Sequence, residues 1–196
     1  AWVETRGQGF ALRLTPLDVS GHFADNRARH GKTWVLTSAT LSVNGHFEHF
    51  TERLGLAEAV TEQFDSPFDY AHNTQLYLPQ GLPDPGHASF TEAYLKAIQP
   101  VLEASRGRAF LLFTSHRALQ QAAQWLQERG WSDLLIQGDA PQSRLLERFR
   151  RQSAAVLLGT QSFWEGVDVR GPALSCVMID RLPFASPGDP VLQARM

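Results

Sequence analysis

Cysteine is almost absent from this sequence, which holds a single one, Cys176, among its 196 residues. One cysteine excludes both a disulfide within the chain and a metal site built from four cysteines of this chain. Because Cys176 lies in the apolar run 174–179, we expect it to be a core residue that packs as a small hydrophobic side chain.

An excess of positive charge is also missing, since 18 Lys and Arg residues stand against 20 Asp and Glu, for a net charge of −2. Any binding of phosphate must therefore come from a local arrangement of charges and amides. No apolar stretch approaches the roughly 18 residues that a membrane span needs. No signal peptide is visible either, so we expect a cytoplasmic protein without membrane contact.

What the chain does contain is enough apolar material for a core, with 43% hydrophobic and 10% aromatic residues. Its length suits one large domain, or one domain with part of a second. The chain opens at Ala1 without an initiator Met and stops at Met196, so we expect it to be a piece of something longer.

The C-terminal half alternates short apolar runs with longer amphipathic segments. Ser115 can cap a helix that Gly130 closes, and a second helix is expected over 139–151. Strands are expected at 109–113, 134–137, 154–158 and 174–179. Strands that alternate with helices in this way indicate a parallel sheet covered on both faces.

The N-terminal half is less regular. Its pattern predicts a half-buried strand at 10–14, helices at 19–30 and 46–54, a β-prone run at 34–37, and a surface connection over 64–86 with one strand at 75–78. Gly55 should end the second of these helices. Ser89 and Glu92 have the spacing of a capping box, at the start of a helix that Pro100 should kink or shorten.

The segment 157–168 carries the strongest functional signal. Its strand ends at Gly159, and a loop follows that brings hydroxyls, bare backbone and two carboxylates together, from Gly159, Thr160, Ser162, Glu165, Gly166 and Asp168. Ligands of parallel sheets bind just beyond the carboxyl ends of strands. Asp168 could accept ribose hydroxyls or hold a metal-bound water, and Gly159 and Thr160 could offer an amide and a hydroxyl to a phosphate.

Three other expected strands are followed by polar residues. Ser38 and Thr40 follow the run at 34–37, Thr114 and Ser115 follow the strand at 109–113, and Gln137 ends the next strand. Each has a plain structural explanation, as a capped turn, a helix N-cap and an ordinary turn. Amides and hydroxyls at a helix N-terminus can also seat a phosphate, so both interpretations stay open.

Two further signals are weaker. Arg144, Arg148, Arg150 and Arg151 could contact phosphates, although a solvated helix face is the favoured interpretation. The segment 31–33 mimics the end of a phosphate-binding loop, but Asn26 stands where the first glycine belongs and a strand follows instead of a helix.

These motifs together resemble the DinG/XPD branch of superfamily 2 helicases. The segment 37–41 (TSATL) resembles motif III, 113–115 (FTS) motif IV, and 157–168 motif V, and the turn 182–190 is similar to the one that precedes motif VI. The resemblance covers roughly residues 16 to 196. It implies an α/β fold, a RecA-like three-layer sandwich with a mostly parallel sheet. Residues 1–45 would end the first motor domain, and residues 46–196 would form the second.

The resemblance also implies roles for these residues. Ser38 and Thr40 would couple ATP hydrolysis to DNA movement. The residues expected to face ATP and the inter-domain cleft are Gly159, Thr160, Glu165, Gly166 and Asp168. The residues expected to contact DNA are Thr114, Ser115, Gln137 and Ser162. No metal ligand is expected in this chain.

The implied activity is that of an ATP-dependent DNA helicase moving 5′ to 3′ in DNA repair or replication. ATP with Mg²⁺ and a [4Fe–4S] cluster would belong to the longer protein, as would motif VI past Met196. The expected partners are single-stranded or forked DNA, the first motor domain, and replication or repair proteins. The piece alone should hydrolyse no ATP.

Two other classes of function stay open. The chain could be a non-catalytic module that binds nucleic acid or docks a protein, in which case an Asp168→Asn parent would unwind DNA normally. It could also be a small-molecule α/β transferase that uses Asp168 on a ribose. A tight complex with adenosylmethionine or a dinucleotide would favour that second class.

Overall fold

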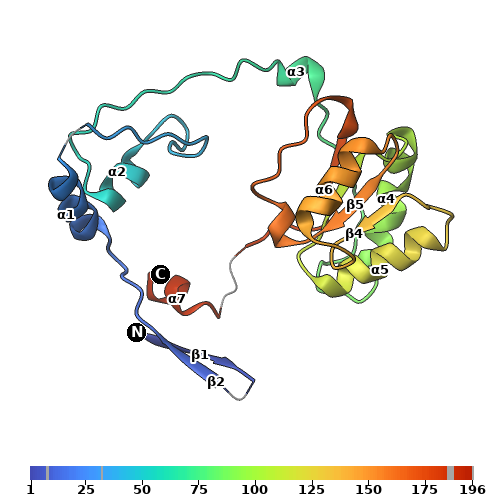
Figure 1. Cartoon of the computed structure of the whole chain (residues 1–196), viewed down its shortest axis with the longest axis horizontal. Coiled ribbons are helices and arrows are strands. Elements are labelled where there is room, and N and C mark those ends of the chain that lie inside the picture. Colours follow the sequence, from blue (N-terminus) through green and yellow to red (C-terminus); the bar gives the residue numbers. More distant parts are fainter. Residues whose placement is uncertain (8, 32, 185–187, 196) are drawn as a thin grey trace. The chain divides into compact units, whose positions relative to one another are not determined.

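The computed structural model describes residues 1–7, 9–31, 33–184 and 188–195 (Figure 1). The chain divides into two compact units. The larger unit is Leu76–Phe184, and the smaller one combines Ala1–Gln75 with the described C-terminal residues.

The larger unit is built on a parallel sheet. Its strands are β3 (Ala109–Leu112), β4 (Leu134–Ile136), β5 (Val156–Gly159) and β6 (Cys176–Ile179), in the order β4-β5-β3-β6. Leu112 of β3 lies opposite Gly159 on one side and Ile179 on the other, so neighbouring strands end level with one another. All four strands expected in this half are present, and the prediction that they run parallel is confirmed.

Helices cover both faces of this sheet. One face packs against α4 (Phe90–Ala104) and α5 (His116–Gln127), and the other against α6 (Gln142–Arg151). Two short 3₁₀ turns follow β5, η1 (Gln161–Phe163) and η2 (Gly171–Ala173). The result is the expected three-layer arrangement, with a hydrophobic core on each side of the sheet (Figure 1).

The local sequence explains these elements. Every residue of β3 and β5 is buried, as expected for central strands with apolar runs. The inward residues of α5 include Leu119, Ala122, Ala123 and Leu126, and those of α6 are Leu145, Leu146 and Phe149. These are the apolar faces that helical spacing predicts.

The start of α4 differs from its prediction. Ser89 occupies the N-cap position, but its backbone is helical (φ −84°, ψ −2°) and its side chain does not cap the helix. Its Oγ lies instead 2.8 Å from Nδ1 of His87, and Glu92 pairs with Lys96 at 2.7 Å. The capping box was therefore a wrong prediction. The helix also continues past Pro100 to Ala104, so Pro100 does not shorten it.

The smaller unit holds a hairpin and short helices. Its elements are β1 (Trp2–Arg6), β2 (Gly9–Arg13), α1 (Ser20–His30), α2 (Glu48–Leu54), α3 (Tyr70–Asn73) and α7 (Pro190–Arg195). Strands β1 and β2 pair antiparallel. Gly55 ends α2 in the left-handed conformation, at φ 64°, as the sequence predicted.

Three strand predictions in this half need correction. Strand β2 is present, but Phe10 and Leu12 are 74% and 76% exposed, so it is not half-buried. The runs 34–37 and 75–78 form no strand. A strand is stable only when a neighbour pairs with its backbone, and neither run has such a partner among the described residues. The strand expected to lead into Ser38 is therefore absent.

None of the helices in the described ranges is both long and apolar enough to span a bilayer.

Candidate functional site

Polar residues from all four parallel strands meet at the carboxyl edge of the sheet in the larger unit. Thr114 follows β3, Gln137 follows β4, Thr160 follows β5 and Asp180 follows β6. Because the strands end in register, the loops after them lie side by side. This edge is where open parallel sheets bind ligands.

Gln137 and Thr160 are joined directly. The backbone amide of Thr160 donates to Oε1 of Gln137 at 2.6 Å, and its hydroxyl donates to the same oxygen at 3.1 Å. Thr160 is 7% exposed, and it is the single polar residue classed as buried in the described part of the chain. Gln137 was predicted to contact DNA, and Thr160 to face ATP. In the structure these two residues bond to each other and so join the loop after β4 to the loop after β5.

Gly159 allows a close approach of Phe163. A Cβ added at Gly159 would lie 2.8 Å from the Cβ and ring atoms of Phe163, which is 3% exposed. The carbonyl of Gly159 accepts the amide of Phe113 at 2.8 Å. Packing against Phe163 therefore accounts for a glycine at this position.

Thr114 is held by Asp180. Its amide donates to Oδ1 of Asp180 at 3.1 Å, and its hydroxyl lies 3.5 Å from Oδ2. The Asp180 side chain is only 3% exposed. Burial raises the pKa of this carboxyl, while the Thr114 amide and the Arg181 charge act in the opposite direction.

Ser115 is the N-cap of α5. Its Oγ accepts the amide of Ala118 at 3.2 Å, as the sequence predicted. The next amides, those of His116 and Arg117, have no acceptor among the described residues, as is usual in the first turn of a helix. Ser115 thus acts as the N-cap of α5, and next to it the amides of His116 and Arg117 remain without a partner among the described residues.

Asp180 and Arg181 were not predicted as site residues. Nε of Arg181 lies 3.7 Å from Oδ2 of Asp180, and its guanidinium is 5.3 Å from the ring centroid of Phe90. The sequence did contain a signal for them. They are the first charged residues after the last strand, at the same edge as Thr114 and Gln137.

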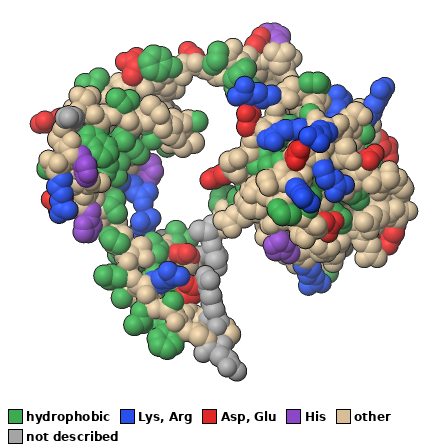
Figure 2. All heavy atoms as spheres, viewed as in Figure 1, with side chains coloured by type: hydrophobic (Ala, Val, Ile, Leu, Met, Phe, Trp, Pro, Cys, Tyr) green, Lys and Arg blue, Asp and Glu red, His purple; other side chains and the backbone are tan. Residues whose placement is uncertain are grey.

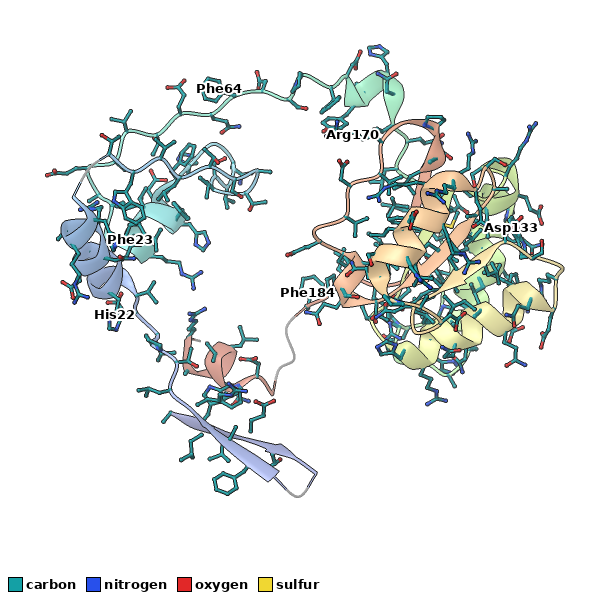
Figure 3. All side chains as sticks on the ribbon, viewed as in Figure 1. His22, Phe23, Phe64, Asp133, Arg170 and Phe184 are labelled. Atoms are coloured by element: carbon teal, nitrogen blue, oxygen red, sulfur yellow. The ribbon has the colours of Figure 1, made fainter. Side chains whose placement is uncertain are left out.

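The loop after β5 leads away from this edge. The carbonyl of Asp168 accepts from Arg150 at 2.7 Å, and its carboxylate pairs with Arg170 at 3.0 Å. Arg150 lies in the last turn of α6, which runs back toward the opposite edge of the sheet. Figure 3 shows Arg170 well separated from Phe184, which lies just after β6. Asp168 is therefore not grouped with Thr114 and Ser115.

The other predicted site residues of this loop after Thr160 are open to solvent. Ser162, Glu165 and Gly166 are exposed, and Gly166 has a φ of 71°. The carbonyl of Ser162 accepts from the side chain of Gln142 at 2.8 Å, which ties the loop to the first turn of α6.

Ser38 and Thr40 lie in the smaller unit. Ser38 Oγ is 3.2 Å from Thr40 Oγ1 and accepts the Thr40 amide at 3.2 Å, so the pair forms a local turn. Both residues are exposed.

Lys and Arg side chains gather over α6 (Figure 2). Two of its arginines already have partners, since Arg150 donates to Asp168 and Arg151 pairs with Glu147 at 2.7 Å. Across the described ranges, no cluster of three or more His, Cys, Asp or Glu side chains could hold a metal ion.

The larger unit is thus an α/β domain of the kind that binds ligands at the carboxyl edge of a parallel sheet. The sequence profile of the helicase C-terminal domain family matches residues 98–196, half of the chain, and the chain belongs to that family. This confirms the family resemblance drawn from the motifs and the RecA-like α/β fold that it implied.

Several curated proteins are similar along the whole chain. It is 40% identical over 195 residues to an ATP-dependent DNA helicase YoaA of Haemophilus influenzae, covering 100% of this chain and 30% of that protein. The YoaA of Escherichia coli is 42% identical over 195 residues, covering 100% of this chain and 31% of its own length. An ATP-dependent helicase DinG of Mycobacterium tuberculosis is 42% identical over 188 residues, 94% of this chain and 28% of that protein. The chain thus spans about 30% of the length of these relatives.

Proposed function

We propose that this chain is the C-terminal motor part of an ATP-dependent DNA helicase, with residues 1–45 ending the first motor domain and residues 46–196 belonging to the second. The observation that carries the proposal is the family membership, together with relatives named as ATP-dependent DNA helicases along the whole chain. The proposed substrate is single-stranded or forked DNA, and the proposed location is the cytoplasm.

The carboxyl edge supports the DNA-binding half of this proposal. Ser115 and the unpaired amides after it can meet a backbone phosphate, since they lie at a helix N-terminus. The donors of Thr114 and Thr160 are already bound to Asp180 and Gln137. We infer that Thr114 shapes the DNA contact and that Ser115 makes it, while Thr160 remains a proposed residue of the ATP and inter-domain side.

The loop after β5 supports the nucleotide half. Asp168 keeps 71% of its side chain exposed, and Arg170 engages one of its two carboxylate oxygens. The other carboxylate oxygen of Asp168 can accept hydrogen bonds from ribose hydroxyls. Glu165 and Gly166 belong to the same loop, just before Asp168 in the sequence. In the longer protein ATP would supply the phosphoanhydride that is cleaved, Mg²⁺ would offset the charge of its phosphates, and Ser38 and Thr40 would relay that event to the DNA.

An iron–sulfur cluster does not fit the residues of this chain. Cys176 is the sole cysteine of the sequence and lies within β6, half-buried, where burial raises the pKa of its thiol. Such clusters need several thiolates. A cluster, like replication or repair partners, is thus proposed only for the longer protein.

Hydrolysis of ATP tests the proposal. The longer protein should hydrolyse ATP in the presence of single-stranded DNA, whereas this chain alone should not. Asp168→Asn in the longer protein should lower hydrolysis and unwinding together. An Asp168→Asn protein that unwinds normally would instead favour a non-catalytic binding or docking module.

A further inference from the structure

We propose that Arg181 binds a backbone phosphate of the DNA strand at the carboxyl edge, and that Asp180 holds both Arg181 and Thr114 in place for this contact. The inference rests on the proposed helicase function and deepens it. It proposes that Arg181, which lies outside all of the recognised motifs, supplies the positive charge that holds the DNA strand at the carboxyl edge of the sheet.

The backbone sets the position of the pair. The amide of Asp180 donates to the carbonyl of Leu112 at 3.1 Å, which continues the pairing of β6 with β3 by one residue. Asp180 therefore stands next to Thr114, and Arg181 follows directly. Both residues lie at the edge where Ser115 begins α5.

The surroundings of Arg181 restrain its guanidinium without using up its donors. The side chain is 35% exposed and lies between the Asp180 carboxylate, at 3.7 Å, and the ring of Phe90, at 5.3 Å. Within the described ranges its buried Nε has no hydrogen-bond partner. A guanidinium has five N–H groups and matches the oxygens of a phosphate in geometry.

Charge also favours Arg181 over its neighbours as the phosphate ligand. The amide and hydroxyl of Thr114 are directed at Asp180, so they are not available to DNA in this arrangement. A nearly buried carboxylate at this edge would repel a phosphate unless a cation stood between them. Arg181 is that cation, since its Nε lies 3.7 Å from Oδ2 of Asp180.

Arg129 provides a matched control. It is also an arginine held over an aromatic ring, with its guanidinium 3.7 Å from the centroid of Trp125 and a hydrogen bond to the Trp125 carbonyl at 3.2 Å. It follows α5, however, at the opposite edge of the sheet from Ser115. Arg129→Gln thus removes a similar charge and stacking contact without touching the proposed site.

The test is the salt dependence of single-stranded DNA binding by the longer protein, measured by fluorescence anisotropy with a labelled oligothymidylate. Each phosphate contact adds about 0.7 to the slope of log affinity against log salt concentration for a single strand. Arg181→Gln should therefore lower the slope by about 0.7, because one contact is lost. Arg181→Lys should keep the wild-type slope, and so should Arg129→Gln.

The proposal is overturned if Arg181→Gln keeps the wild-type slope, or if Arg129→Gln lowers it equally. Should Arg181→Gln unfold because Asp180 loses its ion-pair partner, the double variant with Asp180→Asn removes both charges and is measured in the same way. A wild-type protein that binds no single-stranded DNA would overturn the proposed function itself. Binding with an unchanged slope in Arg181→Gln would overturn this inference alone.

Discussion

Hydrogen bonds that the side chains of Asp180 and Gln137 accept from neighbouring loops fix the positions of these loops at the carboxyl edge without a ligand. Thr114 is bonded to Asp180 and Thr160 to Gln137, each across two neighbouring strands. A hydrogen bond of this kind contributes about 0.5–1.5 kcal/mol to stability, and rather more when one partner is charged. The loops are thus arranged by the protein itself, which reduces the ordering that DNA or nucleotide would have to impose.

Gly159→Ala should destabilise the larger unit by about 1–3 kcal/mol, because the added methyl would overlap Phe163. Urea unfolding of this chain, followed by circular dichroism, measures the change. Gly21→Ala is the control, since a Cβ there meets nothing within 4 Å. A Gly159→Ala chain as stable as the wild type would show that Phe163 can move aside freely.

Some residues of the site could be found from sequence and others could not. Gln137, Thr160 and Ser115 were identified because each lies at or just after the end of an apolar run, and their placement at one edge follows from parallel pairing. Asp180 also follows a strand, but its bond to Thr114 joins residues 66 positions apart. Only the strand order, with β6 beside β3, brings these two together.

Helix α5 depends on Ser115, the residue that caps its N-terminus. Ser115→Ala should cost about 1 kcal/mol, since it leaves the Ala118 amide without its cap. Ser115→Asp should restore that stability, because a carboxylate caps well and suits the positive end of the helix. Thermal unfolding of this chain measures both, with exposed Ser132→Ala as a control expected to match the wild type.

The same pair of variants separates capping from DNA binding. In the longer protein, Ser115→Asp should weaken binding of single-stranded DNA even though the helix is stable, because its charge repels the phosphate. Unchanged DNA affinity in Ser115→Asp would argue that Ser115 is an N-cap and nothing more.

Elements were predictable where local pattern and tertiary pairing agree. The strands of the larger unit are apolar runs that pack on both faces, so burial reinforces what the sequence suggests. The run 34–37 has similar β-forming residues, but no neighbouring strand pairs with it among the described residues. Strand β1 was missed for the opposite reason: its residues are largely polar, and pairing with β2 makes the hairpin.

At the scale of the whole molecule, stability is concentrated in one unit. Both hydrophobic clusters lie within the larger unit, whereas Leu56 is the one buried residue among those described in the smaller unit. This division by packing falls after Gln75. The proposed boundary between the two motor domains lies at residue 45. That boundary is based on resemblance to a helicase family, whereas the boundary after Gln75 is based on packing within this chain.

Residues 76–184 expressed alone should therefore unfold in one cooperative transition, with a midpoint close to that of the main transition of the whole chain. Residues 1–75 alone, the matched comparison, should show no cooperative transition. Differential scanning calorimetry distinguishes the two. Loss of cooperativity in 76–184 would mean that the smaller unit contributes to the core in solution.

Strand β6 pairs with β3 on one side and ends the sheet on the other. Val177 is 51% exposed and Ile179 39% exposed, so this outer strand presents apolar side chains together with backbone groups that no other strand in the described ranges pairs with. Such strands recruit further strands from other molecules. We therefore expect concentrated solutions of the isolated polypeptide to self-associate through β6, and Val177→Lys should keep it monodisperse in light scattering.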